Sequence, residues 1–230
     1  YACVSFVDYQ VGRILDGLEK IGQADNTLVL FLSDHGEYLG DYNCFGKFSM
    51  HDAAVRVPLI ARYPKCFQAG SVSHTPVSLV DVAPTILSAS GTAPIGHPLD
   101  GLDLADVAAG HCERTEVFSQ YCTGEKAMTM IVNEQWKYFY SVPDGREYLF
   151  DRVGDPEETV NRASLELCED ARLEMKAHLI DFLRSVGETD ILDGDDWKTI
   201  PKMELPANPD ALLPIQDQSW ADLTIPGYSL

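Results

Sequence analysis

The sequence predicts an α/β fold that is followed by a small antiparallel sheet and a long helix. An amphipathic helical pattern over residues 2–20 leads into a continuously apolar run over residues 27–32. A helix followed by a strand buried on both faces is typical of a parallel sheet. Four short strand-like runs follow one another in the second half of the chain, and such a succession favours an antiparallel sheet.

The first half of the chain alternates helices with apolar strands. Apolar side chains recur at helical spacing over residues 2–20, which predicts a helix with one apolar face. Residues 27–32 and 56–63 have the length and composition of core strands, and residues 78–89 again show helical spacing. Residues 90–112 are rich in Gly and Pro and are therefore predicted to form a loop.

The second half is predicted to form a separate α+β module. Its strand-like runs cover residues 116–121, 127–133, 135–141 and 147–151. An amphipathic helix is predicted over residues 164–186. Residues 188–230 lack periodicity and are rich in acidic residues and proline. We expect them to form an irregular tail that packs on the rest of the protein or contacts a second copy of the chain.

The chain is strongly acidic, because 36 Asp and Glu stand against 17 Lys and Arg, for a net charge of -19. Such a surface repels nucleic acids and anionic membranes, so neither is expected as a partner. A site for an anionic substrate therefore needs its own positive charge from a metal ion, a lysine or an arginine. No apolar stretch has the length of a membrane span.

The sequence contains six cysteines, none of them in a C-x-x-C pair, so a zinc site is not expected. Two states remain open for them, namely three disulfides or buried free thiols in a reducing compartment. The compartment, which is periplasmic, secreted or lysosomal on one side or cytoplasmic on the other, is not resolvable without the N-terminus.

The first predicted strand ends in a polar turn, Ser33-Asp34-His35-Gly36. Sites in open α/β sheets form beyond the carboxyl ends of strands, and both carboxylate oxygen and imidazole nitrogen bind divalent cations. Two ligands are too few for Ca²⁺, which takes about six to eight oxygens. The alternative is a loop in which Asp34 caps the next element and His35 lies on the surface. Taken alone, Lys47 and His51 fit a solvated charge and a buried imidazole as readily as substrate contacts.

These pieces together resemble the sulfatase family of the alkaline phosphatase superfamily, and are most similar to its iduronate-2-sulfatase-like branch. The resemblance rests on an ordered run over residues 30–60 that reads S-D-H-G, then L-G, then G-K, then R-V-P-L-I. Further matches lie at residues 80–85, 149–151 and 155–158, and the similarity spans residues 1–185. Several motifs in the right order are more specific than any one of them.

The resemblance implies an alkaline-phosphatase-like fold, in which a parallel-sheet sandwich is followed by a small antiparallel sheet with a helix. It also implies hydrolysis of the sulfate ester of a small molecule or a saccharide. Asp34 and His35 match two metal ligands of the family, for Ca²⁺ or alternatively Mg²⁺ or Mn²⁺, and Asp34 is also expected to polarise the nucleophile. Lys47 matches the lysine that binds the sulfate group, and His51 is a candidate substrate contact. A cation and a lysine neutralise the sulfate oxygens as the ester bond breaks.

The sequence departs from the family at the nucleophile, which is a formylglycine made from Cys or Ser in a C/S-x-P/A-x-R motif. This motif is absent here. We therefore expect the formylglycine and the other metal ligands on an upstream segment, which makes the chain a fragment or one chain of a cleaved protein. Tyr42 stands where many members have His, which puts a histidine contact there in doubt. Tyr42, Asn43 and the loop over residues 92–104 are further candidates for the pocket wall.

On this basis residues 1–112 are predicted to be the C-terminal part of the catalytic domain, residues 113–187 an α+β subdomain, and residues 188–230 the tail. Two other functions remain open. One is a phosphonate monoester or phosphodiester hydrolase of the same superfamily, which shares the metal site and the lysine and favours Mn²⁺ or Zn²⁺. The other is a non-catalytic fragment that serves assembly.

Overall fold

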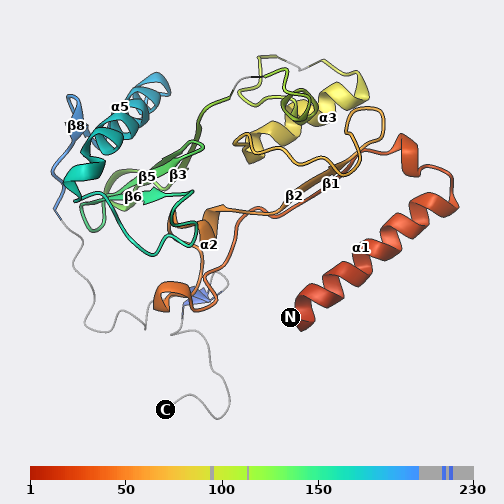
Figure 1. Ribbon diagram of the computed structural model, residues 1–230, viewed down its shortest axis with the longest axis horizontal. Helices are drawn as coiled ribbons and strands as arrows, with labels where there is room; N and C mark the ends of the chain where they lie inside the picture. The colour runs from red at the N-terminus through yellow and green to blue at the C-terminus, as the bar shows by residue number, and fades with distance from the viewer. Residues whose placement is uncertain (94–95, 113, 202–213, 216–217, 220–230) are drawn as a thin grey trace, which may run out of the picture. The chain divides into compact units, whose positions relative to one another are not determined.

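The computed structural model describes residues 1–93, 96–112, 114–201, 214–215 and 218–219 (Figure 1). The chain divides into two compact units that are interleaved in sequence. The first comprises Tyr1–Ser33 and Pro58–Arg114, and the second comprises Asp34–Val57 and Thr115–Leu230. The segment Asp34–Val57, which carries the candidate site, thus belongs with the second half of the chain. The division into domains at residues 112 and 187 stays a prediction.

The first unit begins with the predicted helix, α1 (Ala2–Lys20), which is followed by the short 3-10 helix η1 (Ala24–Asn26). Strand β1 (Val29–Leu32) pairs with β2 (Leu59–Arg62), and the two lie side by side in Figure 1. The helix and both strands lie where the hydrophobic pattern predicts them, although α1 has no buried residue and its apolar side chains, such as those of Val4 and Ile14, are exposed.

The direction of pairing differs from the expectation for the first strand. β1 and β2 run antiparallel, with Phe31 opposite Ile60. The side chains of Phe31 and Ile60 are exposed to 37% and 61%, so burial on both faces is also wrong for this pair. A continuous apolar run indicates a strand but carries no information on its direction, which depends on the partner strand.

The end of the first unit contains a helix where a loop is predicted. The 3-10 helix η3 (Leu79–Asp81) leads into α3 (Val82–Ser90), and α4 (Leu104–Ala108) follows within the Gly- and Pro-rich stretch. The side chain of Asp103 accepts a hydrogen bond from the N–H of Ala105 at the start of α4 (2.9 Å). A helix this short shows too little periodicity to be recognised in the sequence.

The second unit is built around the predicted antiparallel sheet. Its strands are β3 (Val117–Tyr121), β4 (Met128–Val132), β5 (Trp136–Ser141) and β6 (Arg146–Asp151), in the order β3-β4-β5-β6. Each strand pairs antiparallel with the next one along the chain. The short connections between them require this direction, because parallel strands need a long crossover. The expected α/β fold with a following antiparallel sheet is confirmed.

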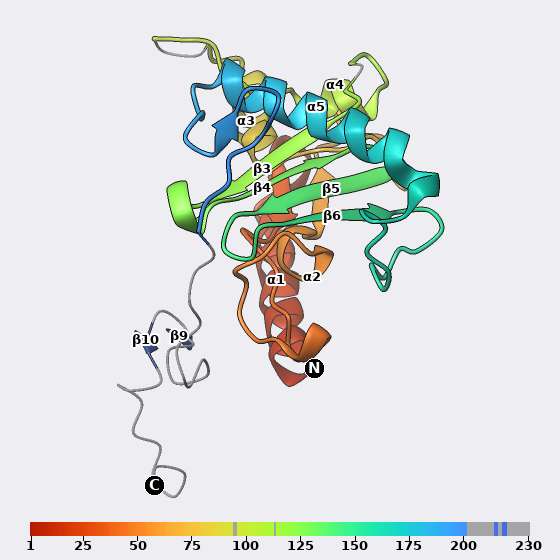
Figure 2. The same ribbon diagram turned by 90° about the vertical axis from the view of Figure 1, so that its left-hand side faces the viewer.

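The two faces of this sheet pack against different parts of the unit. The predicted C-terminal helix, α5 (Glu169–Ser185), crosses one face, whereas α2 (Asp52–Val55) lies on the opposite side (Figure 2). Side chains alternate along β5, so Tyr138 and Tyr140 join the core under α5. Phe139 points the other way and packs with Met50, Met130 and Phe150.

The beginning of the tail is ordered and is not irregular as expected. After the 3-10 helix η5 (Glu166–Cys168) and α5, the strands β7 (Leu192–Asp193) and β8 (Asp196–Trp197) form a hairpin. The indole N–H of Trp197 donates to the hydroxyl of Tyr138 (2.8 Å), and the side chains of both residues are buried in the core. Ile191 joins the same core, and two such contacts dock a short hairpin without leaving a periodic pattern in the sequence.

Further along the tail, β9 (Pro214–Ile215) pairs with β10 (Gln218–Ser219). The predicted contact of the tail with a second copy of the chain falls largely on residues 202–213, 216–217 and 220–230, which lie outside the described residues. Within the part that is described, no helix combines the length and the apolar character needed to cross a membrane. All six cysteines are free thiols.

Candidate functional site

The turn Ser33-Asp34-His35-Gly36 leads into the second unit, where Gly36 packs directly on α2. The N–H of Gly36 donates to the carbonyl of Ala54 (2.7 Å). A Cβ atom at Gly36 would lie 2.0 Å from the carbonyl oxygen of Ala53, so no other residue fits at this position without moving the backbone. The contact fixes where the chain runs immediately after Asp34 and His35.

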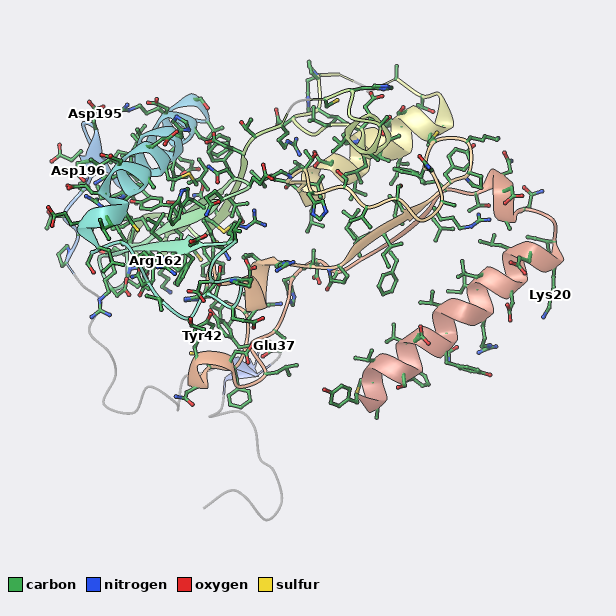
Figure 3. The ribbon with its side chains drawn as sticks, in the orientation of Figure 1. Lys20, Glu37, Tyr42, Arg162, Asp195 and Asp196 are labelled. Atoms are coloured by element: carbon green, nitrogen blue, oxygen red, sulfur yellow. The ribbon has the colours of Figure 1, made fainter. Side chains whose placement is uncertain are left out.

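The loop over residues 37–46 then returns the chain to His35. Its ends are joined by the N–H of Tyr38, which donates to the carbonyl of Gly46 (2.9 Å), and by Glu37, whose carboxylate accepts from the N–H of Gly46 (2.5 Å). Glu37 and Tyr42 mark this loop in Figure 3. The 3-10 helix η2 (Asp41–Asn43) forms its tip.

The tip of this loop contains backbone conformations that most residues avoid. Leu39, Tyr42 and Asn43 all have positive φ angles, of 50°, 54° and 57°. Such conformations cost free energy in residues other than glycine and persist where surrounding contacts hold them. The hydroxyl of Tyr42 makes one such contact, since it donates to the carbonyl of Glu157 (3.0 Å).

The result of this loop geometry is that Lys47 meets His35. The Nζ atom of Lys47 lies 2.6 Å from Nε2 of His35, and that Nε2 lies 3.4 Å from Oδ2 of Asp34. On the other side of the ring, Nδ1 of His35 lies 2.8 Å from the carbonyl oxygen of Gly36. A carbonyl only accepts, so Nδ1 carries the proton and Nε2 presents its lone pair toward Lys47 and Asp34.

The charge at this site keeps Asp34 ionised. Its side chain is 83% exposed. Desolvation is the largest single cause and raises the pKa of the carboxyl, but the charge of His35, the backbone N–H groups of Asp34 and His35 and the charge of Lys47 together outweigh it, so the pKa of Asp34 lies below its ordinary value. The carboxylate is therefore available to a cation at neutral and mildly acidic pH.

Asp34 and His35 fit one metal ion as part of its coordination shell. Ligand atoms at about 2.3–2.6 Å from Ca²⁺ lie no more than about 5 Å from each other, and the 3.4 Å between Oδ2 of Asp34 and Nε2 of His35 meets this limit. With the proton on Nδ1, the lone pair of Nε2 is the one that would face a cation, and the ammonium of Lys47, which lies 2.6 Å from Nε2, would have to move to a sulfate oxygen when a cation binds. Within the described residues no group of three or more His, Cys, Asp or Glu could hold a metal ion, so further ligands would have to join these two.

His51 lies in an aromatic cluster rather than beside Lys47 and His35. Nδ1 of His51 is within hydrogen-bonding distance of the hydroxyls of Tyr38 (2.8 Å) and Ser49 (2.7 Å). Burial, followed by the nearby charge of Lys137, lowers the pKa of His51 to about 4. The ring contacts five aromatic side chains, namely Tyr38, Tyr42, Phe139, Tyr148 and Phe150. Of the two alternatives that the sequence left open for His51, these surroundings suit a packed imidazole. A substrate contact by His51 stays a prediction.

The other predicted wall residues are distributed over both units. Tyr42 and Asn43 lie on the loop over residues 37–46, in the same unit as Lys47. The stretch over residues 92–104 belongs to the first unit, and its residues 94–95 lie outside the described part of the chain. A role of these residues in the pocket wall stays a prediction.

A buried ion cluster lies behind the site, and sequence reasoning assigned it no role. The ammonium of Lys137, whose side chain is fully buried, lies 2.5 Å from Oδ1 of Asp52 and 2.6 Å from Oε1 of Glu158. Burial raises the pKa of both acids. In Asp52 the charge of Lys137 prevails and the net shift is downward, whereas in Glu158 burial prevails and the net shift is upward. A lysine inside the apolar strand run W-K-Y-F-Y was the available signal, because a buried lysine requires acidic partners.

Comparison with known proteins gives consistent matches. A sequence model of the family described as Sulfatase matches residues 1–92. An arylsulfatase of Clostridium perfringens is 30% identical over 191 residues, which are 81% of this chain and 38% of that protein. A choline-sulfatase of Rhizobium meliloti is 34% identical over 168 residues, which are 71% of this chain and 32% of that protein. The chain thus spans well under half the length of these relatives.

Solved structures show the same relationship at the level of the fold. A protein in complex with its substrate D-glucosamine-2-N,6-O-disulfate matches with a TM-score of 0.74 at 29% identity, over 81% of this chain and 40% of that one. The phosphonate monoester hydrolase of Agrobacterium radiobacter matches with a TM-score of 0.69 at 29% identity, over 80% of this chain and 40% of that one. These matches confirm the fold that the resemblance implies.

Proposed function

The chain belongs to the sulfatase family, and on this premise we propose that it supplies two metal ligands and a sulfate-binding lysine to a sulfate ester hydrolase. The observation that carries the proposal is the meeting of Lys47 with His35, at 2.6 Å, beside the carboxylate of Asp34. These three residues match the positions at which the family places its lysine and two of its metal ligands. The iduronate-2-sulfatase-like branch stays a prediction.

Each residue has a distinct part in this proposal. Lys47 places a positive charge where the sulfate oxygens bind, in a chain whose net charge of -19 otherwise repels anions. Asp34 and His35 hold a divalent cation, with Ca²⁺ proposed and Mg²⁺ or Mn²⁺ as alternatives. When bound, the cation polarises the sulfate ester and stabilises the charge that develops as the bond breaks. Asp34 also orients the hydroxyl of the nucleophile.

The nucleophile is proposed to be a formylglycine on a segment outside these 230 residues. None of the six cysteines stands in the family's C/S-x-P/A-x-R motif. The aligned residues make up 38% and 32% of two relatives, so more than half of each relative lies outside the match. Such a segment could lie in that remainder. We propose that Asp34, His35 and Lys47 act together with it and do not break the ester bond alone.

The proposed substrate is a sulfated saccharide or a sulfated small molecule. One matched structure contains D-glucosamine-2-N,6-O-disulfate as its substrate, and another match, at 24% identity and a TM-score of 0.72, is described as a 2-O glycosaminoglycan sulfatase. A choline-sulfatase is also among the relatives, so a small sulfate ester remains the alternative.

Phosphonate monoester hydrolysis is the second candidate, because a phosphonate monoester hydrolase matches with a TM-score of 0.69 at the same 29% identity as the saccharide-bound protein. Both reactions need a cation and a lysine on a tetrahedral anion. They differ in the reacting group, so they are separable by assay.

The test compares turnover of aryl sulfate and aryl methylphosphonate esters, with added Ca²⁺ or Mn²⁺, by the longer native protein and by the 230-residue chain alone. We expect hydrolysis of the sulfate ester by the longer protein and none by the chain alone. Faster hydrolysis of the phosphonate would favour the second candidate. Full activity of the isolated chain would refute an external nucleophile.

A further inference from the structure

The ion cluster of Lys137, Asp52 and Glu158 occupies the face of the sheet that carries the site segment. Lys137 projects from β5 on the same side as Phe139, which packs with Met50. Its ammonium contacts both carboxylates, and the second oxygen of Glu158 accepts from the backbone N–H of Asp52 (2.7 Å). Glu158 therefore binds both a side chain of the sheet and the backbone of the site segment.

The first connection from this cluster runs to the metal-ligand side of the site. Asp52 is the first residue of α2, so Lys137 and Glu158 hold the beginning of this helix. Near the end of α2, the carbonyl of Ala54 accepts a hydrogen bond from the N–H of Gly36. Because Gly36 has no room to shift toward α2, the place of α2 determines the place of the residues directly before Gly36.

The second connection runs to the lysine side of the site. Glu158 has a positive φ of 54°, and the hydroxyl of Tyr42 shares its one proton between the carbonyls of Glu157 (3.0 Å) and Glu158 (3.2 Å). Tyr42 lies at the tip of the loop whose closure, by the bonds to Gly46, delivers Lys47 to His35. The side chain of Glu158 thus anchors α2 while its backbone anchors the loop.

We propose that Lys137 and Glu158 are positioning residues that hold Asp34, His35 and Lys47 in their mutual arrangement from behind, without touching substrate or metal. This inference rests on the proposed function for its catalytic consequence. Packing alone does not require the cluster, since replacing a whole buried ion pair by apolar side chains of similar volume is often neutral or stabilising. The apolar neighbours Met130, Phe139 and Phe150 show that this face accepts such side chains.

The chain contains a matched control on the opposite face of the sheet. Lys176 of α5 is also buried, with a relative exposure of 8%, and also contacts two acids. Its Nζ lies 2.5 Å from Oδ1 of Asp196 and 3.3 Å from Oε1 of Glu147. Asp196 is labelled beside α5 in Figure 3. Disrupting this cluster costs stability but leaves the connections to Gly36 and Tyr42 untouched.

The experiment compares Lys137→Met, Glu158→Gln and Lys176→Met in the native protein that carries the chain. Glu158→Gln keeps the size of the side chain but has a single oxygen, which cannot replace both the contact with Lys137 and the acceptor for the N–H of Asp52, so this variant serves if Lys137→Met does not fold. Hydrogen exchange of the Gly36 and Gly46 amides reports the two connections, and kcat with an aryl sulfate reports their consequence. We expect both exchange rates to rise and kcat to fall about tenfold or more in the first two variants. Lys176→Met is expected to change kcat by less than about twofold, and to lower the melting temperature less than Lys137→Met does, because the side chain of Asp196 is 71% exposed.

The outcomes separate this inference from the proposed function. Unchanged exchange at Gly36 and Gly46 in folded Glu158→Gln overturns the positioning role, as does an equal loss of kcat in Lys176→Met. Faster exchange in the first two variants, in a wild-type protein that hydrolyses no sulfate ester, supports the positioning role and refutes the sulfatase proposal.

Discussion

The ammonium of Lys47 lies 2.6 Å from Nε2 of His35, the imidazole atom that is also directed toward the carboxylate of Asp34. This arrangement places a permanent positive charge directly beside two atoms that suit a divalent cation. An anion that binds to such a cation has the lysine within reach of its other oxygens. The same geometry therefore suits a tetrahedral anion, such as the sulfate group of an ester, better than a neutral ligand.

Removal of the lysine is expected to impair turnover strongly. Lys47→Ala should lower kcat/KM for a sulfate ester by about 100-fold, because one donor to the developing charge in the transition state is lost. Initial rates measured in the native protein over a range of substrate concentrations test this. Lys65→Ala is the control, since Lys65 is an exposed lysine that bonds to Asn26. Equal turnover in Lys47→Ala and wild type would exclude a role for this residue.

Metal affinity is expected to depend on Asp34. Asp34→Asn should weaken Ca²⁺ binding by about tenfold or more, because a neutral amide replaces an ionised carboxylate ligand. Isothermal titration of the native protein after chelator treatment measures this directly, without substrate. Asp16→Asn removes the same charge from the exposed surface of α1 and should leave the affinity unchanged. A similar loss in both variants would mean that net charge, and not coordination, controls binding.

Gly36 is expected to tolerate no side chain. Gly36→Ala should lower the free energy of unfolding by about 2–3 kcal/mol, since the new Cβ atom would lie 2.0 Å from the carbonyl oxygen of Ala53. Gly17→Ala in α1 offers the opposite case, because an added Cβ atom would meet no atom within 4 Å beyond its chain neighbours and the backbone of its own helix, and alanine favours a helix by up to about 1 kcal/mol. Urea unfolding of both variants checks the difference in sign, and a stable Gly36→Ala would contradict the close approach.

His51 is expected to destabilise the fold in acid. Its pKa is about 4 in the folded protein, below the ordinary value of 6.5. The unfolded chain therefore takes up a proton at a higher pH than the folded chain, and stability on the order of 2–3 kcal/mol is lost as the pH falls from 6.5 to 4. His51→Gln should flatten this dependence in urea unfolding at several pH values.

His178 provides a control of opposite sign. Its hydrogen bond with Glu116 raises the pKa of His178, so the stability that it contributes is present at low pH and disappears as the pH rises through that raised pKa. His178→Gln should therefore remove stability in acid. If both variants changed the pH dependence in the same direction, the buried environment of His51 would not be its cause.

The sequence predicted the elements of this fold well where side-chain periodicity is long. Helix α1 and the strands β3 to β6 lie where the pattern places them. The strands contribute to the cores of the second unit, whereas none of the residues of α1 is buried. The antiparallel pairing of β1 with β2 was not predictable, since strand direction depends on the partner. The short α4 and the hairpin of β7 and β8 depend on a few tertiary contacts, which leave no periodic signal.

The candidate site was predictable only in its parts. Asp34, His35 and Lys47 stood out by residue type and by an ordered motif, and the structure brings these three together. The environment of His51 was not predictable, because three of its five aromatic neighbours come from strands about a hundred residues away in sequence. The same holds for Lys137 and Glu158, which reach Asp52 across 85 and 106 residues.

The alternation along β5 has a consequence for how the protein can change over time. Even-numbered positions such as Tyr138 serve the helix side, and odd-numbered positions such as Lys137 serve the site side. Substitutions can therefore alter one side while sparing the other. Insertion or deletion of one residue in the strand would exchange the two sets, so we expect length changes to accumulate in the turn over residues 142–145 and to be absent from β5.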